Sequence, residues 1–300
     1  MSSDASKPYR GRFAPSPSGP LHFGSMVAAL GSYLDARHHR GAWLLRMEDL
    51  DPPREKPGAA DDILCTLEAF GFEWDEAVLY QSSRQEAYRA ALETLHQAGL
   101  AYPCGCSRRE IAKSGGEGIE GFVYPGTCRS GTIHDRSPRS IRLRTNANPL
   151  AFSDKVCGKL QQNIEREVGD FVVRRADGLF SYQLAVVIDD AFQSITHVVR
   201  GADLLLSTPR QIYLQQLLGL PNPYYAHLPL ALGADGRKLS KQSRAQPVLK
   251  ENPLPALLAA FGFLNQQIPD DVPGDLKSFW EWALTNWSIE QVPGRNSGAG

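Results

Sequence analysis

The sequence of 300 residues predicts an α/β protein built on a doubly wound parallel sheet with an inserted subdomain. Strand and helix patterns alternate over the first 100 residues, which is typical of parallel sheets whose connections are helices. From Ala101 to about Arg144 the helical period is lost, glycines become dense and three cysteines appear. We expect this segment to be an insertion packed around a metal ion.

The first elements form a predicted β-α-β unit. Residues Tyr9–Ala14 have the pattern of a strand, and apolar residues at spacings of three and four predict a helix from Phe23 to about residue 39. Gly41 ends this helix, and Ala42–Met47 has the pattern of a second strand. Such units have parallel strands, so we expect the ligand of the sheet at the carboxyl ends of its strands.

Two further helices complete this region. One follows Pro57 and runs to Phe70, with Cys65 in its apolar pattern and therefore expected in the core. The other begins at a capping box formed by Ser83 and Glu86 and ends near Gly99.

The middle of the chain contains strand, turn and helix signals. Residues 139–144 alternate polar and apolar side chains, as in a half-exposed strand. Asp177-Gly178 predicts a hairpin between strands at Phe171–Arg175 and Leu179–Val187. Thr208-Pro209 predicts a helix with Thr208 as cap, ending near Gly219.

These signals divide the chain into three parts. We assign residues 1–100 and 176–245 to the sheet domain, residues 101–175 to the insertion, and residues 246–300 to a short helical segment, with a helix at 253–261, and a loose tail. Residues 1–8 have the composition of a disordered lead.

The composition is that of an ordinary globular chain, with 42% hydrophobic and 22% charged residues. The net charge of −1 and the pI near 6.7 show no global attraction to nucleic acid, so any RNA contact must come from a local patch. No apolar run has membrane-spanning length and no signal pattern opens the chain, which predicts a cytoplasmic protein without a membrane partner. Five cysteines, an odd number, argue against a disulfide framework. We expect a monomer.

Two separated segments have the chemistry of a triphosphate site. His22 falls at the start of the first helix, where free N–H groups and the helix dipole favour phosphate, and Gly24 leaves room for a nucleotide. Far downstream, Lys238 and Lys241 lie in the segment Lys-Leu-Ser-Lys-Gln. An imidazole and a mobile ammonium group can stabilise the charge that builds up when a carboxylate attacks an α-phosphorus. Taken singly, the first segment has the composition of an ordinary turn and the second that of a solvated loop.

Together, these segments resemble the two signatures of class I aminoacyl-tRNA synthetases, His-x-Gly-His and Lys-Met-Ser-Lys-Ser. The resemblance implies a Rossmann-type catalytic domain that uses ATP with Mg²⁺. It assigns catalysis to His22, Ser25, Lys238 and Lys241, and ATP binding to His22, Gly24 and Lys241. The chain departs from the signatures at Ser25, where the family has its second His, and at Gln242, where it has the last Ser. A hydroxyl at position 25 still donates to phosphate, but without a charge.

Other blocks are similar to the glutamyl- and glutaminyl-tRNA synthetase subgroup: Arg12–Gly19, Arg46–Asp51, Tyr182–Asp190 and Val198–Leu206. This resemblance implies that L-glutamate is the amino acid. It places the ammonium group on Glu48 and the rest of the ligand on Arg12, Phe13, Ala14, Pro15, Ser16, Tyr182 and Arg200. Glutamate carries two carboxylates and one ammonium group, and such a ligand requires arginine forks and one acidic residue. Without the resemblance, Glu48 would be read as part of a solvated acidic turn and Arg200 as a surface arginine.

The insertion contains a candidate zinc site. Cys104, Cys106 and Cys128 supply three thiolates, which suit tetrahedral zinc, although three reduced structural cysteines are the alternative. By chemistry alone His134 is the ordinary fourth ligand. The pattern Cys-x-Cys followed by Tyr-x-x-x-Cys resembles a zinc site of glutamyl-type synthetases, which implies Tyr124 instead. We expect one structural Zn²⁺ per chain.

Several arginines surround these cysteines in sequence: Arg108, Arg109, Arg129, Arg136, Arg139, Arg142 and Arg144. They either contact RNA phosphates or form a solvated face.

The chain has no room after its second signature for the anticodon-reading region of a complete glutamyl-tRNA synthetase. It resembles a short branch of the family that consists of the catalytic half alone. That resemblance implies activation of glutamate without tRNA, and transfer to the queuosine base in the anticodon of tRNA(Asp). The alternatives are a truncated synthetase that charges the tRNA 3′ end, a nucleotidyltransferase that acts on no tRNA, and an inactive RNA-binding module.

Overall fold

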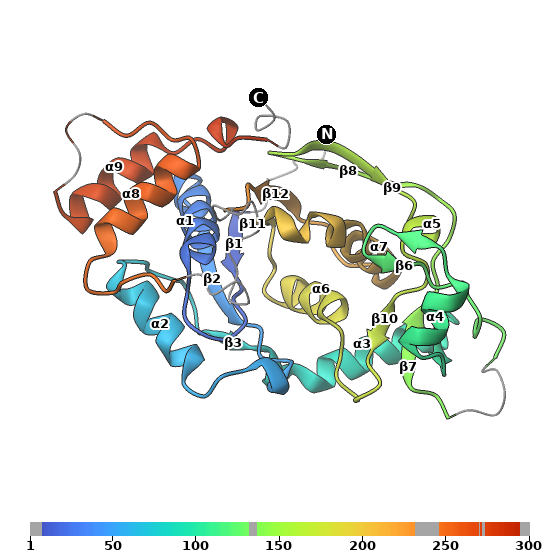
Figure 1. The fold of residues 1–300 in the computed structure, drawn as a ribbon. Helices are drawn as coiled ribbons and strands as arrows, with labels where there is room; N and C mark the ends of the chain where they lie inside the picture. Colours follow the sequence, from blue (N-terminus) through green and yellow to red (C-terminus); the bar gives the residue numbers. More distant parts are fainter. Residues whose placement is uncertain (1–7, 132–136, 232–245, 270, 272–273, 295–300) are drawn as a thin grey trace.

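The computed structural model describes residues 8–131, 137–231, 246–269, 271 and 274–294. Its centre is a set of parallel strands (Figure 1). In one ladder β2 (Ala42–Met47) lies between β1 (Arg10–Phe13) and β3 (Leu79–Tyr80), and in the other β11 (His197–Gly201) pairs with β12 (Tyr224–Leu228). The N–H of Thr196 donates to the carbonyl of Arg10 at 2.9 Å, which places β11 beside β1. The predicted β-α-β unit and its parallel strands are confirmed.

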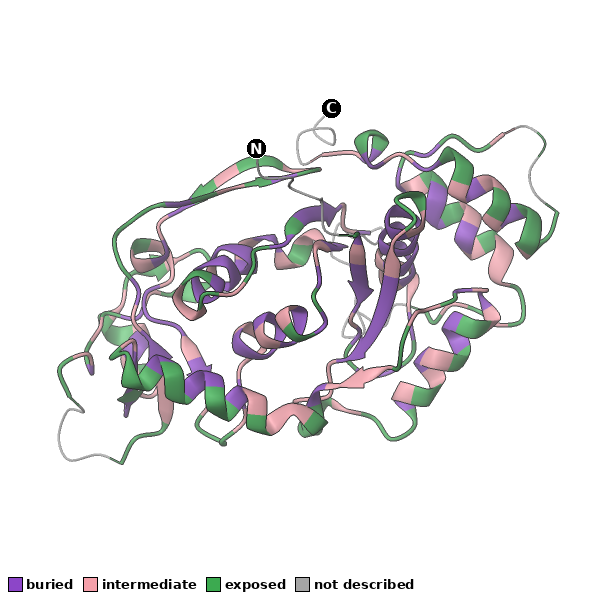
Figure 2. Ribbon diagram, turned by 180° about the vertical axis from the view of Figure 1, so that it is seen from behind, coloured by how far each residue is buried: buried purple, intermediate pink, exposed green. Residues whose placement is uncertain are grey.

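Helices cover both faces of these strands, as a doubly wound fold requires. In β2, Trp43, Leu45 and Met47 enter one core and Leu44 enters the other, because successive side chains of a strand point to opposite faces. Most residues of β2 and β11 are accordingly buried (Figure 2). The first core is covered by α1 (Phe23–His38), α2 (Ala59–Ala69) and α8 (Pro253–Phe263), and the second by α3 (Gln85–Gln97), α6 (Tyr182–Phe192) and α7 (Thr208–Leu218).

The prediction of a strand at Leu179–Val187 is wrong, because most of this segment lies in a helix. The bridge between Arg174 and Phe180 confirms a hairpin turn, but the chain then enters α6. Ser181 caps this helix by accepting the N–H of Leu184. Residues Leu184–Ile188 of α6 form a continuous apolar run, and a run of this kind does not distinguish a buried strand from a buried helix.

The insertion contains an antiparallel sheet in which β7 (Ser140–Leu143) lies between β10 (Val172–Arg174) and β4 (Ala101–Cys104). The predicted strand at 139–144 is confirmed as β7. A short helix there was not predicted, although Ser107 and Glu110 form a complete capping box for it. The elements are β4 (Ala101–Cys104), α4 (Arg108–Ser114), β5 (Glu117–Gly118), β6 (Gly121–Phe122), β7 (Ser140–Leu143), α5 (Ile164–Glu167) and β10 (Val172–Arg174).

A hairpin of the insertion extends the parallel strands. It consists of β8 (Leu150–Asp154) and β9 (Gly158–Gln162), and β8 pairs in parallel with β12 where Asp154 faces Tyr225. The insertion therefore contacts the sheet directly, and the three-part division of the chain remains a prediction.

The C-terminal part contains more structure than we expected. The predicted helix at 253–261 is confirmed as α8, but the expected loose tail includes a second helix, α9 (Leu276–Asn286). Asp275 caps α9, and Phe279, Ala283 and Trp287 are buried in the first core. Their spacing of four residues was the helical signal that we missed.

Three smaller expectations are also wrong. Cys65 is exposed on α2 rather than buried. The hydroxyl of Ser83 donates to the carbonyl of Tyr80, and α3 begins only at Gln85 without a side-chain cap. Thr208 is the first residue of α7 and Ser207 occupies the cap position. Among the described helices, none is both long and apolar enough to cross a lipid bilayer.

Candidate active site

A cavity of about 260 Å³ lies at the carboxyl ends of β1, β11 and β12. It opens where the strand order reverses between β1 and β11, which is the usual ligand position in such sheets. Every described residue that the sequence assigned to glutamate or ATP lines it: Arg12, Phe13, Ala14, Pro15, Ser16, His22, Gly24, Ser25, Glu48, Tyr182 and Arg200. The structure thus brings the predicted residues together, as the sequence required.

A larger cavity of about 550 Å³ lies near the amino ends of β11 and β12. His197 lines this cavity, and its imidazole ring is stacked between the rings of Tyr9 and Tyr224, with ring centroids 3.9 and 5.0 Å apart. None of the residues predicted to bind ligand lines this cavity. We therefore place the candidate site in the smaller one.

The first turn of α1 forms one wall of the site. His22 is the N-cap residue, and its Nδ1 accepts the N–H of Ser25 at 3.2 Å. The hydroxyl of Ser25 lies 3.3 Å from His22 Nε2, so the residue that departs from the family signature contacts the imidazole directly. No acidic residue occupies the first turn of α1, and the positive end of the helix dipole opens into the cavity.

Lys238, Lys241 and Gln242 lie outside the described residues. Both flanks of their segment are at the site. Ala231 lines the cavity, and Pro247 forms an antiparallel bridge with His22. The residues that flank the segment on both sides therefore lie at the cavity, beside the first turn of α1.

Two buried arginines meet one carboxylate behind the cavity. Arg12 Nε lies 3.2 Å from Asp190 Oδ1, and Arg46 Nη2 lies 2.8 Å from the same oxygen. Burial alone would raise the pKa of Asp190, but the two guanidinium groups lower it below its ordinary value. Asp190 is therefore ionised and fixes both arginines.

Glu48 follows β2 and is held differently. Its Oε1 is 3.6 Å from Arg46 Nη2 and has no hydrogen-bond donor among the described residues. Burial raises the pKa of the Glu48 carboxyl to about 7, against the opposing effects of Arg46 and Arg12. A buried carboxylate oxygen without a donor, in a cavity wall, has the chemistry of a site for a cation.

Arg200 at the end of β11 is oriented by several acceptors. Its Nη2 donates to Thr208 and Gln211 at 2.9 and 2.7 Å, and its Nη1 donates to the Tyr182 hydroxyl at 3.3 Å. Tyr182 lines the cavity. The fork of Arg200 is therefore held in one orientation at the wall.

Sequence reasoning missed four residues of this region: Arg46, Asp154, Asp190 and His227. All four are buried and charged or titratable. Arg46 interrupts the apolar run of β2, and Asp190 follows the apolar run of α6. A charge inside an apolar run was the available signal, because such groups are seldom buried without a partner.

The insertion brings its candidate metal ligands together. The sulfur atoms of Cys104, Cys106 and Cys128 all lie within 4.8 Å of one another, and the Tyr124 hydroxyl is 3.4 Å from Cys104 Sγ. Tetrahedral zinc separates its sulfur ligands by roughly 3.8 Å. This cluster can hold a metal ion. His134 lies outside the described residues.

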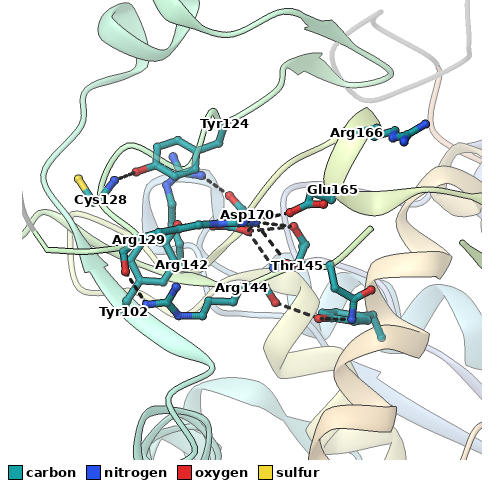
Figure 3. Close-up of polar contacts among 12 residues, drawn as sticks. Tyr102, Tyr124, Cys128, Arg129, Arg142, Arg144, Thr145, Glu165, Arg166 and Asp170 are labelled. Carbon is teal, nitrogen blue, oxygen red and sulfur yellow. Dashed lines mark hydrogen bonds and ion pairs between the residues drawn. The ribbon is translucent and has the colours of Figure 1, made fainter. Parts of the chain in front are cut away.

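The arginines around this cluster have two different environments. Arg129 binds both oxygens of Asp170 at 2.6 Å, and Arg142 lies over the Tyr124 ring (Figure 3). Arg142 also donates to Cys104 Sγ. Arg144 donates to the carbonyl of Arg129, so these three are structural rather than free for RNA. Arg108, Arg109 and Arg139 are exposed, and Arg136 is outside the described residues.

Comparison with known proteins agrees with this geometry. Residues 9–253 match the family model for the catalytic domain of class I tRNA synthetases (E and Q). Glutamyl-Q tRNA(Asp) synthetases from Dechloromonas aromatica and Aromatoleum aromaticum are 58% and 54% identical, and the matches cover 95% and 98% of this chain and 96% and 93% of those proteins. A glutamate-tRNA synthetase from Elizabethkingia anophelis superposes with a TM-score of 0.77 at 25% identity, over 96% of this chain and 67% of that one. The chain therefore belongs to the glutamyl-Q tRNA(Asp) synthetases, within the class I tRNA synthetases for glutamate and glutamine.

Proposed function

We propose that the protein activates L-glutamate with ATP, without tRNA, and transfers it to the queuosine base in the anticodon of tRNA(Asp). In the first step a glutamate carboxylate oxygen attacks the α-phosphorus. The bond to the β-phosphate oxygen breaks, pyrophosphate leaves and glutamyl-adenylate forms. In the second step the base attacks the acyl carbon and AMP leaves.

The observation that carries the amino-acid assignment is the Glu48 oxygen that lacks a donor in a cavity shared with two arginines. Glu48 would bind the ammonium group of glutamate, and Arg12 and Arg200 its carboxylates. Tyr182 and the turn from Phe13 to Ser16 would complete the pocket. Binding of the ammonium group would replace the donor that Glu48 Oε1 lacks.

ATP would lie against the first turn of α1, with its phosphates at His22, Gly24 and Ser25. Mg²⁺ would accompany the triphosphate. Lys241, assisted by Lys238, would stabilise the charge on the α-phosphate in the transition state. The positions of Ala231 and Pro247 support this, because both flanks of the lysine segment meet the site.

The cysteine cluster would bind one Zn²⁺ through Cys104, Cys106, Cys128 and Tyr124. Three sulfur donors and one phenol oxygen at these spacings fit a closed tetrahedral site. Such a site has no open position for substrate, so the ion would stabilise the insertion and take no part in the reaction.

The tRNA would contact the exposed arginines of the insertion. Arg108 and Arg139 line a surface hollow beside the cysteine cluster. Their guanidinium groups would neutralise backbone phosphates. We further propose that the sheet domain and insertion divide as the sequence suggested, and that the protein acts as a cytoplasmic monomer.

Two measurements test the function. Glutamate should support exchange of labelled pyrophosphate into ATP with no tRNA present, and an inactive RNA-binding module or a nucleotidyltransferase specific for another acid would show none. Labelled glutamate should then be loaded onto tRNA(Asp), and the tRNA cut with a base-specific ribonuclease. Label in the anticodon fragment supports the queuosine acceptor, whereas label at the 3′ end identifies a truncated charging enzyme.

A further inference from the structure

His227 on β12 connects the candidate pocket to the insertion. Its Nε2 lies 3.1 Å from Arg200 Nε, and its Nδ1 lies 2.6 Å from Asp154 Oδ2 on β8. The side chains of His227 and Asp154 are fully buried. The three residues thus form one buried chain, Asp154–His227–Arg200, that begins in the insertion and ends in the pocket wall.

The direction of the two hydrogen bonds of the His227 ring follows from which of its partners can donate. A guanidinium nitrogen can only donate, so Nε2 of His227 must carry the lone pair. The proton of the neutral ring then lies on Nδ1, where it is donated to Asp154. Burial lowers the pKa of His227 to about 4, against the effect of Asp154, which agrees with a neutral ring.

Asp154 is itself rigidly placed. Its Oδ1 accepts the backbone N–H groups of Val156, Cys157 and His227 at 3.0, 2.8 and 3.1 Å. The second oxygen remains for the imidazole. Asp154 therefore selects the ring tautomer of His227 as well as its position.

We propose that Asp154 and His227 are positioning residues for the amino-acid site: the carboxylate fixes the proton on Nδ1, and the resulting lone pair on Nε2 holds Arg200 in the orientation that receives the substrate carboxylate. The inference rests on the proposed role of Arg200 in binding glutamate. Without the acceptor at Nε2, the buried Nε–H of Arg200 would lose its partner, and the guanidinium would be held only by the Nη contacts to Thr208, Gln211 and Tyr182. Partners of this kind typically change affinity or activity by 10- to 100-fold in metal sites, and we expect a similar scale here.

Kinetics of pyrophosphate exchange test the role of the acceptor. His227→Ala should raise the KM for glutamate by roughly 10- to 100-fold, with the KM for ATP and the rate at saturating glutamate little changed. His227→Gln offers a carbonyl oxygen near the former Nε2 and should recover most of the loss. His96→Gln, at an exposed site on α3, is the matched control. Equal changes in kcat and in both KM values for His227→Ala, without recovery by Gln, would indicate general disruption and overturn the proposal.

Asp154→Asn tests the tautomer. The amide keeps the oxygen that accepts the backbone N–H groups but can donate to Nδ1, which would move the ring proton to Nε2 and oppose Arg200. The glutamate KM should rise as in His227→Ala, and the same substitution in the His227→Gln background should add little. Additive effects would overturn the coupling.

A spectroscopic measurement separates this inference from the proposed function. Nitrogen NMR of histidine-labelled protein at pH 7 should show a neutral His227 ring protonated on Nδ1, and Asp154→Asn should shift the proton to Nε2. A wild-type ring that is charged, or protonated on Nε2, overturns the positioning mechanism even if glutamate is activated. The expected tautomer in a protein that neither binds nor activates glutamate refutes the proposed function and with it the role of Arg200, while the hydrogen-bond chain stands.

Discussion

Glu48 Oε1 lies 3.6 Å from Arg46 Nη2, beyond hydrogen-bond distance, although both groups are buried in the same charged cluster. Arg46 is instead bound by Asp190 and Gln193 at 2.8 and 2.9 Å. The arginine thus pairs with Asp190 rather than with Glu48, although its Nε and Nη2 atoms, like Glu48 Oε1, make no regular hydrogen bond among the described residues. Under the proposed function, this oxygen would receive the ammonium group of glutamate.

Replacement of Glu48 by Gln should weaken glutamate binding. The amide keeps the shape of the side chain but loses its charge, and a charged hydrogen bond contributes about 1.5–3 kcal/mol. We expect the KM for glutamate in pyrophosphate exchange to rise by roughly 10- to 100-fold, with a much smaller change in the KM for ATP. A glutamate KM within twofold of the wild type would contradict the ammonium role.

The same variant should change how stability depends on pH. The folded pKa of Glu48 is about 7, above the ordinary value of 4.5, so the folded state binds more protons than the unfolded state between these values. This contribution to stability is fully present below pH 4.5 and is lost as the pH rises through 7. Glu48→Gln should therefore gain on the order of 2 kcal/mol relative to wild type between pH 4.5 and 8. Urea unfolding at both pH values measures the difference, and parallel pH curves for the two proteins would refute it.

Lys241→Ala should separate binding from chemistry. If Lys241 stabilises charge only in the transition state, kcat for adenylate formation should fall by roughly 100- to 1000-fold while calorimetric binding of glutamate is preserved. Lys250→Ala is a suitable control, since Lys250 pairs with Asp62 on α2 away from the cavity. Loss of glutamate binding in Lys241→Ala would place this lysine in the amino-acid pocket instead.

The metal site can be tested by measuring the zinc content of the protein and of its variants. Purified protein should contain one zinc per chain by elemental analysis, and Tyr124→Phe should reduce zinc retention against a chelator by at least about tenfold. His134→Ala should retain zinc normally. If His134→Ala loses the metal and Tyr124→Phe does not, the fourth ligand is the histidine.

The sequence was sufficient for elements whose signals are local. The β-α-β unit from Arg10 to Met47 has an alternating or helical period and a Gly41 stop, and the structure follows it closely. The helix α6 was missed because its continuous apolar run, Leu184–Ile188, is equally compatible with a buried strand. α9 had a usable period in Phe279, Ala283 and Trp287 and an N-cap residue in Asp275, and both signals were overlooked.

The candidate site shows the same limit. Arg12, Glu48 and Arg200 were found because each lies in a block with a family resemblance. Asp154 and His227 are 73 residues apart and carry no motif, and only the pairing of β8 with β12 brings them together. Contacts that depend on strand order between distant segments have no local signal in a single sequence.

The pairing of β8 with β12 has a practical consequence for protein engineering. A minimal activating core made by excising residues 101–175 would remove β8 and expose the edge of β12, and it would leave the imidazole of His227 without its carboxylate. The β8–β9 hairpin thus belongs to the insertion in sequence and to the parallel sheet in space. Shortened versions of this enzyme should be designed to retain it.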